Sequence, residues 1–146
     1  NPNVTDNEII EAINQVKLSY LLEEDNLDKL ILEEGKNLSG GERQRLILAT
    51  QLTTKRKIYL FDEATSNIDI DSEEVIMKNI YNLSNDSLVI VISHRLENIV
   101  DANYIYLLDE EIVIEKGNHK NLINMNKEYA LLYKTQKALE TGYVRD

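Results

Sequence analysis

Two carboxylates follow an apolar segment in the middle of the chain: Asp62 and Glu63 come directly after Ile58 to Phe61. An aspartate at a strand end can hold Mg²⁺, directly or through water, because this ion usually keeps several waters. A glutamate beside it can orient or deprotonate an attacking water molecule. The pair predicts a magnesium ligand at Asp62 and a catalytic base at Glu63. Taken alone, such a pair is more often two solvated acids at the end of a strand.

A second group of residues that could bind a ligand is Ser39-Gly40-Gly41-Glu42, which precedes an apolar helical pattern. Glycines let the backbone approach a phosphate closely, and the N-terminus of a helix offers free N–H groups and a positive dipole end. The Ser39 hydroxyl adds a further donor. The same four residues also fit the S-x-x-E capping box, so a purely structural helix start is the alternative.

The third candidate is His94, which follows the apolar segment Leu88–Ile92 and Ser93. An imidazole at that place can donate a hydrogen bond to a transferring phosphate. A lone histidine is more often a surface residue, and that reading stays open for His94 by itself. The other histidine, His119, is interpreted as a helix cap or a surface residue.

The order and spacing of these groups resemble the ATP-binding cassette (ABC) ATPases. Leu38 to Arg45 reads LSGGERQR, similar to the family's signature sequence, and Ile58 to Ser66 reads IYLFDEATS, similar to its magnesium strand and catalytic glutamate. Ile92 to Leu96 reads ISHRL and resembles the switch-histidine segment of exporter cassettes. Ser66 to Asp69 reads SNID and is similar to the family's S-A-L-D loop, with asparagine in place of alanine.

The resemblance implies a division of labour in a head-to-tail dimer that encloses two ATP molecules. One pocket would receive from this chain the magnesium ligand and the catalytic pair, which are Asp62, Glu63 and His94. The opposite pocket would receive the signature and the interface loop, which are Ser39, Gly40, Gly41, Glu42 and Asp69. The implied cofactors are ATP and Mg²⁺. The implied partners are a second nucleotide-binding domain and the transmembrane domains of an exporter, at the cytoplasmic face of the cell membrane.

The phosphate-binding loop G-x-x-x-x-G-K-[ST] does not occur in these 146 residues. Glycine is found only at five positions, namely 35, 40, 41, 117 and 142. We therefore expect the chain to be the carboxyl-terminal part of a nucleotide-binding domain, excerpted from a longer polypeptide. We also expect it to hydrolyse ATP poorly by itself.

Composition limits the remaining function classes. A formal net charge of -10 argues against a surface that neutralises nucleic-acid phosphates, so no nucleic-acid partner is expected. The absence of cysteine excludes disulfides and thiolate metal sites. No apolar run approaches the roughly 20 residues that a membrane-spanning helix needs.

Periodicity predicts an α/β fold with parallel strands and flanking helices. The resemblance to ABC ATPases implies that this is a partial P-loop NTPase core with a remnant of the helical subdomain. Expected helices cover 6–22 with a cap at Thr5 or Asp6, the segment after Ser39, and 72–83 with a cap at Asp71. Expected strands are 58–61 and 88–92, each covered on both faces, and a hairpin joins 104–108 to 112–114. One or two helices follow between 119 and 139. The expected division is 1–38, part of the helical subdomain, and 39–146, the signature helix and the rest of the core.

Two other functions remain open at this level. The chain could belong to an ABC ATPase that moves no substrate, such as a DNA-repair, chromosome-organising or ribosome-associated member. The His-Arg-Leu segment and Ala102 to Asp109, similar to the exporter A-D-x-I-x-V-L-D strand, favour the exporter. The chain by itself could also be an inert binding fragment.

Overall fold

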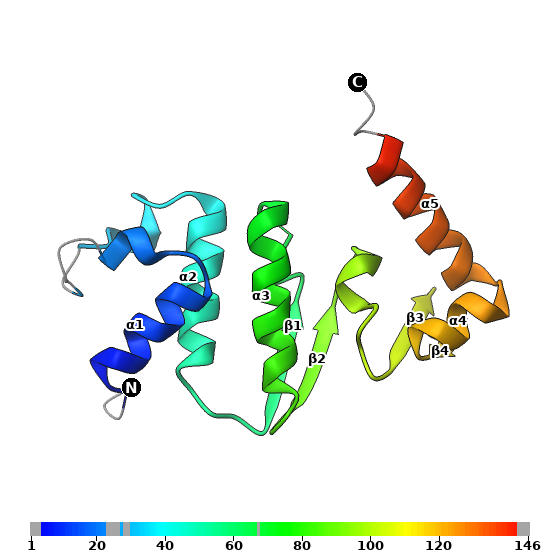
Figure 1. Cartoon of the computed structure of the whole chain (residues 1–146), viewed down its shortest axis with the longest axis horizontal. Helices are drawn as coiled ribbons and strands as arrows, with labels where there is room; N and C mark the ends of the chain where they lie inside the picture. Colours follow the sequence, from blue (N-terminus) through cyan, green and yellow to red (C-terminus); the bar gives the residue numbers. More distant parts are fainter. Residues whose placement is uncertain (1–3, 23–26, 28–29, 67, 143–146) are drawn as a thin grey trace. The chain divides into compact units, whose positions relative to one another are not determined.

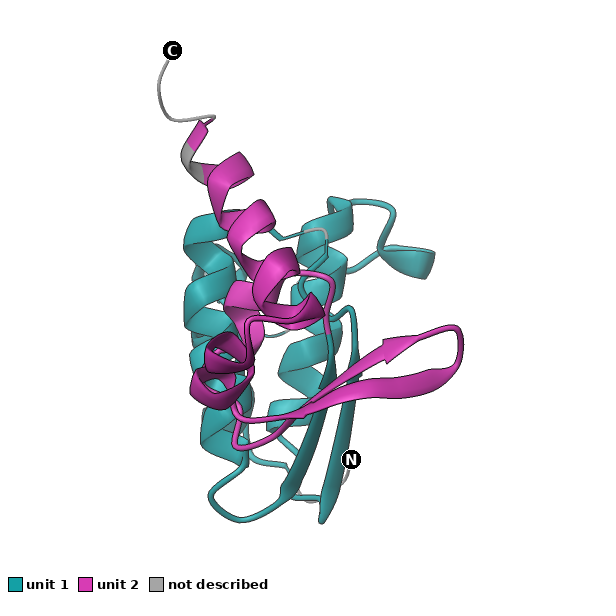
Figure 2. Cartoon of the chain, turned by 90° about the vertical axis from the view of Figure 1, so that its right-hand side faces the viewer, with its two compact units in different colours: residues 1–92 teal, residues 93–146 magenta. Residues whose placement is uncertain are grey.

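The computed structural model describes residues 4–22, 27, 30–66 and 68–142. The chain divides into two compact units, residues 1–92 and 93–146 (Figure 2). The predicted boundary at Leu38 lies inside the first unit, where residues on both sides of it share one hydrophobic core. The assignment of 1–38 to a separate subdomain stays a prediction.

The first unit is built on a strand–helix–strand arrangement (Figure 1). Strand β1 (Ile58–Asp62) pairs in parallel with β2 (Leu88–Ile92), in a register that sets Ile58 opposite Leu88 and Asp62 opposite Ile92. Helix α3 (Ile70–Leu83) connects the two strands. The α/β prediction is confirmed, and both strands were located to within one residue.

Only one face of this sheet is covered by the described residues. Tyr59 and Phe61 are 5% exposed and belong to the core, whereas Ile58 and Leu60 on the other face are 60% and 64% exposed. Alternate residues of a strand point to opposite faces, so the apolar run divides between core and solvent. The expectation that both faces would be covered is wrong for this chain.

Helix α1 (Asp6–Gln15) is shorter than the predicted helix 6–22. Thr5 caps it through a capping box with Glu8, as predicted. The helix stops because Lys17 adopts a left-handed backbone with φ of 54°, and the Leu18 N–H then bonds to the Ile13 carbonyl. This reversal buries Leu18 completely and leads into the 3₁₀ helix η1 (Ser19–Leu22).

Helix α2 (Gly40–Leu52) follows a second short 3₁₀ helix, η2 (Glu33–Gly35), and packs against α1. Its inward side chains are Leu48 and Ala49, whereas Ile47 is 64% exposed. Helix α3 begins two residues earlier than expected, and its cap is Asp69 instead of Asp71. The Asp69 side chain accepts the Ser72 N–H at 2.9 Å, which satisfies one of the unpaired donors of the first turn.

The second unit contains the predicted hairpin, formed by β3 (Ile105–Asp109) and β4 (Ile112–Gly117). Glu110 and Glu111 make the two-residue turn with φ of 43° and 66°, as a type I′ loop requires. The 3₁₀ helix η3 (Leu96–Ile99) and helices α4 (His119–Met125) and α5 (Glu128–Gly142) complete the unit. Leu96, Ile105, Leu122 and Tyr129 form its core. Within the described ranges, no helix is long and apolar enough to cross a membrane.

Candidate functional site

The signature segment forms the start of α2, and its side chains are held by a reciprocal capping box. The Ser39 hydroxyl accepts the Glu42 N–H at 3.2 Å, and Glu42 Oε2 accepts the Ser39 N–H at 2.6 Å. The predicted capping box is therefore confirmed. The box also fixes the direction of the first turn, whose exposed N–H groups form the positive end of the helix dipole.

Tyr20 is a further partner of this capping box, and the sequence patterns did not indicate it. Its hydroxyl donates to Glu42 Oε1 at 2.5 Å, across 22 residues of sequence. The bond from Tyr20, together with those from Ser39, lowers the pKa of Glu42 to about 2. Burial and the bond to Glu42 raise the pKa of Tyr20 to about 12. The Glu42 carboxylate is thus ionised and oriented across the whole physiological pH range.

No described residue lies where it would obstruct a side chain at Gly40, the first residue of α2. A Cβ built on it meets nothing within 4 Å, and the residue is exposed. Gly35 differs, because its φ is 64° and a Cβ there would lie 2.9 Å from the Arg43 side chain. Packing within the chain explains the glycine at 35 but not the one at 40.

The predicted metal ligand and base lie at the carboxyl end of β1, and both are exposed. The Asp62 side chain makes no hydrogen bond or ion pair with any described residue. Glu63 continues the strand pairing, since its N–H donates to the Ile92 carbonyl at 3.0 Å. Its φ of 47° is unusual for a residue other than glycine, and it turns the chain sharply out of the sheet.

The strand end is connected to the signature helix by Gln44. The Gln44 Nε2 group donates to the Glu63 carbonyl at 2.9 Å, and that carbonyl also accepts the Ser66 N–H at 3.1 Å. Gln44 Oε1 is buried without a hydrogen-bond partner among the described residues. The signature helix and the Glu63 turn are therefore held together directly, a relationship that sequence spacing alone did not indicate.

Arg45, the next residue, connects the same helix to Asp69. Its Nη1 group lies 3.1 Å from Asp69 Oδ2 and 3.0 Å from Ser72 Oγ. Hydrogen bonds from Ser72, with a smaller contribution from Arg45, lower the pKa of Asp69. The predicted interface residue Asp69 thus serves as the cap of α3 and as an anchor of α2. Asn67, the departure in the same loop, lies outside the described residues.

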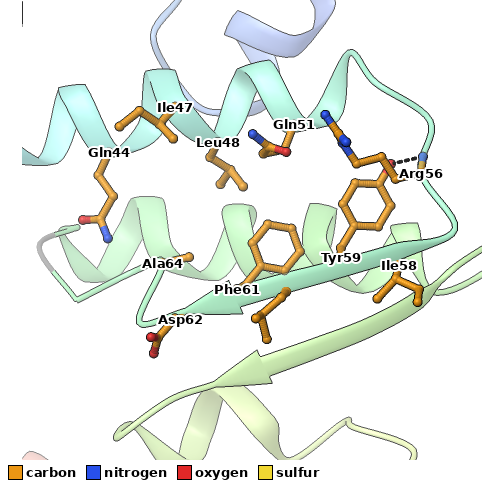
Figure 3. A pocket seen from close by; sticks show the side chains of 11 residues that line it. Gln44, Ile47, Leu48, Gln51, Arg56, Ile58, Tyr59, Phe61, Asp62 and Ala64 are labelled. Atoms are coloured by element: carbon orange, nitrogen blue, oxygen red, sulfur yellow. Dashed lines mark hydrogen bonds between the residues drawn. The ribbon is translucent and has the colours of Figure 1, made fainter.

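An open groove of about 610 Å³ runs between α2 and β1 (Figure 3). Ile47 and Gln51 line it from the helix, and Phe61 and Asp62 line it from the strand. The Tyr59 hydroxyl closes one end by accepting the Arg56 N–H at 3.0 Å. The groove extends along β1 as far as the carboxylate of Asp62.

His94 belongs to the second unit, whereas Asp62 and Glu63 belong to the first. Its side chain is exposed, and its carbonyl accepts a hydrogen bond from Gln136 Nε2 at 2.8 Å. His119 is neither the helix cap nor a simple surface residue: Asn118 caps α4. The His119 Nδ1 atom lies 2.8 Å from the Tyr129 hydroxyl, and its ring packs against Tyr133.

The carboxylate at the end of β1 suits Mg²⁺ better than a metal ion whose ligands are all protein side chains. Among the described residues, no group of three or more histidine, cysteine, aspartate or glutamate side chains is arranged to hold a metal ion. A single exposed carboxylate such as Asp62 fits Mg²⁺, because this ion is commonly bound by one or two carboxylates, substrate phosphates and water.

Comparison with known proteins agrees with this geometry. Residues 2–66 match the family model described as ABC transporter, a stretch that includes the signature and both strand-end carboxylates. An uncharacterised ABC transporter ATP-binding protein of Haemophilus influenzae is 42% identical over 139 residues, which cover 94% of this chain and 25% of that protein. This chain belongs to the ABC transporter ATP-binding proteins.

Two further similarities point to exporters within the family. The alpha-hemolysin translocation ATP-binding protein HlyB of Escherichia coli O157:H7 is 38% identical over 138 residues, covering 92% of this chain and 20% of HlyB. A solved structure of a bacterial Atm1-family ABC exporter with ATP bound has a TM-score of 0.81 and 30% identity, over 93% of this chain and 24% of the exporter. This chain covers about a quarter or less of the length of each of these relatives.

Proposed function

We propose that this chain supplies part of the ATP-hydrolysing domain of an ABC exporter. In this proposal, residues 1–38 are part of the helical subdomain, and residues 39–146 form the signature helix and the rest of the core. The relatives named as exporter components support it. The partners would be a second ATP-binding domain and the transmembrane domains of the exporter, at the cytoplasmic side of the membrane.

The observation that carries the proposal is the direct connection between the signature helix and the Glu63 turn through Gln44. Asp62 would contribute a carboxylate to magnesium, whose charge stabilises phosphate oxygens during phosphoryl transfer. Glu63 would orient or deprotonate the attacking water, and His94 would donate to the phosphate. These three residues would serve the pocket of this domain.

The signature would serve the opposite pocket of the dimer. Ser39, Gly40, Gly41 and Glu42 would face the phosphates of the partner's ATP, and Asp69 would lie in the interface loop. The open space around Gly40 supports this role, because no described residue requires the absence of a side chain there. A phosphate approaching the helix start would gain from its free N–H groups and dipole.

Without the phosphate-binding loop, this chain by itself is proposed to hydrolyse no ATP at a significant rate. Phosphoryl transfer depends mainly on positioning and charge stabilisation, and that loop with its lysine provides most of the positioning. Steady turnover by the purified chain that Glu63→Gln abolishes would disprove this part.

The test of the dimer arrangement uses Ser39→Asp in the complete ATP-binding protein that contains this chain. Aspartate is as good a helix cap as serine, so folding is preserved, but its charge repels a phosphate. We expect ATPase activity to be lost in the homodimer. In hybrids with Glu63→Gln subunits both lesions fall on one pocket, so activity from the other pocket is expected. Full activity of the Ser39→Asp homodimer would refute the phosphate contact.

A further inference from the structure

Gln136 of α5 makes two hydrogen bonds to the backbone beside His94. Its Nε2 group donates to the His94 carbonyl at 2.8 Å, and its Oε1 accepts the Leu96 N–H at 2.7 Å. Both polar atoms of the amide are therefore used, on groups that flank Arg95. The side chain is part-buried, and the bonds span 40 and 42 residues of sequence.

The same segment is held at other points by the same face of α5. Glu97 Oε1 accepts from the Tyr133 hydroxyl at 3.1 Å and lies 3.4 Å from Lys137 Nζ. Glu140 lies 3.9 Å from Arg95. The α5 residues in contact are spaced by three, four and seven positions, which places them on one stripe of the helix: 133, 136, 137 and 140.

The start of α5 is itself fixed in the core of the second unit. Tyr129 is fully buried, and its N–H donates to Glu115 Oε1 at 3.0 Å. The Tyr129 hydroxyl meets His119 Nδ1 at 2.8 Å. Gln136 follows about two helical turns later, so its amide is presented from a rigid element.

The segment that Gln136 contacts has little regular structure of its own. It lies between the end of β2 and η3, and η3 is a single 3₁₀ turn whose cap residue, Arg95, makes no side-chain capping bond. The Ser93 hydroxyl closes a local turn by bonding to both the N–H and the carbonyl of Arg95 at 3.0 Å. Contacts from α5 therefore supply much of what determines the backbone path at His94.

We propose that Gln136 is a positioning residue for His94: its side-chain amide fixes the backbone from His94 to Leu96, so that the imidazole is held ready for the phosphate. The inference rests on the proposed function, since it requires His94 to act in hydrolysis. Displacement of a catalytic group by about 1 Å can lower a rate roughly a hundredfold. Loss of both bonds is thus expected to reduce turnover without removing any group that contacts ATP.

The test replaces Gln136 by leucine, which keeps a similar size and removes both bonds, in the complete ATP-binding protein containing this chain. We expect kcat to fall at least about tenfold while the Kd for MgATP stays within about twofold. Lys134→Ala is the matched control on α5, because it breaks only a bond to Asn126 outside the His94 segment. Parent-like kcat in Gln136→Leu would overturn the inference.

Two comparisons separate positioning from a structural role. In a His94→Ala background, measured in single turnovers, Gln136→Leu should lower the residual rate no further, because a residue that acts through His94 has nothing left to position. An equal fractional loss in both backgrounds would show a structural role and refute the inference. Hydrogen exchange should show lost protection of the Leu96 amide in Gln136→Leu and unchanged protection of the Ile105 amide in β3.

A third variant covers the possibility that Gln136→Leu does not fold. Gln136→Glu can still accept the Leu96 N–H but cannot donate to the His94 carbonyl, so it should keep Leu96 protection and lose turnover. Parent-like turnover of Gln136→Glu would overturn the role of the His94 bond. If His94→Ala alone retains parent activity, the catalytic role of His94 in the proposed function fails. If His94→Ala loses ATPase activity and Gln136→Leu keeps the parent activity, only the role of Gln136 is rejected.

Discussion

The side-chain amide of Gln44 donates to the backbone carbonyl of Glu63 at 2.9 Å, and so connects the signature helix to the strand-end carboxylates. Glu63 has a left-handed backbone, which costs a residue with a Cβ of the order of 1 kcal/mol and has to be held by its surroundings. The Glu63 carbonyl accepts bonds from Gln44 and Ser66, and its N–H donates to Ile92; these three bonds supply that support. The signature helix therefore bonds directly to the backbone of the predicted catalytic base.

Gln44→Leu is the variant that tests this connection. We expect about a tenfold fall in kcat of the complete ATP-binding protein, with ATP binding retained, because the Glu63 turn loses one of its supports. Gln51→Leu is the matched control, since Gln51 lines the same groove on α2 and its side chain bonds only to the neighbouring Thr50 among the contacts described. An unchanged rate in Gln44→Leu would show that the turn holds its shape without the amide.

Glu63→Gln tests the base directly. The amide keeps the shape of the side chain but cannot accept a proton as a carboxylate does. We expect MgATP binding to persist and hydrolysis to fall about 10²–10⁴-fold, the usual range for a general base. Phosphate release and nucleotide affinity should be measured on the same preparation. A variant within threefold of the parent rate would mean that another group activates the water.

Tyr20→Phe should change the acid stability of the chain. Ionised Glu42, with its pKa lowered to about 2, stabilises the fold above the ordinary carboxyl pKa, and this stabilisation is lost as the pH falls toward 2. Removing the Tyr20 hydroxyl, the largest cause of the shift, raises the Glu42 pKa. Thermal melts between pH 2 and 7 should then show a smaller fall in Tm at acid pH than in the parent, because the native and unfolded pKa values of Glu42 lie closer together.

Two features serve as controls for that experiment. The pKa of Tyr20 is raised to about 12, so its bond to Glu42 stabilises the fold below pH 10 and this stabilisation is lost as the pH rises toward 12. The fall in Tm at alkaline pH should therefore also be smaller in Tyr20→Phe. Tyr104→Phe changes an exposed tyrosine in the second unit and should leave the dependence of Tm on pH unaltered. The same dependence of Tm on acid pH in Tyr20→Phe and in the parent would argue against the Tyr20–Glu42 bond in solution.

The isolated chain should self-associate through the open face of the β1–β2 sheet. Leu60 and Ile90 are register partners on this face, and they are 64% and 44% exposed. Contiguous apolar surface and open strand edges favour pairing with other chains. Light scattering at tens of micromolar should detect oligomers of the parent chain.

Charges placed on that face should reduce the association. Leu60→Lys with Ile90→Glu introduces an opposite-charge pair directly across the two strands, which preserves strand pairing while removing apolar area. Leu131→Lys on α5 is the control, because Leu131 is 58% exposed and lies in the other unit. A parent chain that scatters as a clean monomer and melts cooperatively would contradict the prediction.

Local signals in the sequence determined most of the elements. The capping boxes at Thr5 and Ser39 and the apolar strand 88–92 involve residues that are near neighbours, so spacing alone reveals them. Element boundaries were less certain where a single backbone angle decides, as at Lys17, and where two acids compete to cap one helix, as at Asp69 and Asp71. The candidate site residues were likewise found by type and spacing.

Only the tertiary structure revealed what holds those residues. The bonds of Tyr20 to Glu42, Gln44 to Glu63 and Gln136 to His94 join positions 22, 19 and 42 residues apart. No periodicity relates such positions, because the contacts arise where separate elements pack and their side chains reach one another. The sequence by itself identifies the chemical groups at Ser39, Asp62, Glu63 and His94. The contacts of η1 with α2, of α2 with the end of β1 and of α5 with the start of η3 decide which neutral amides and hydroxyls hold Glu42 and the backbone at Glu63 and His94.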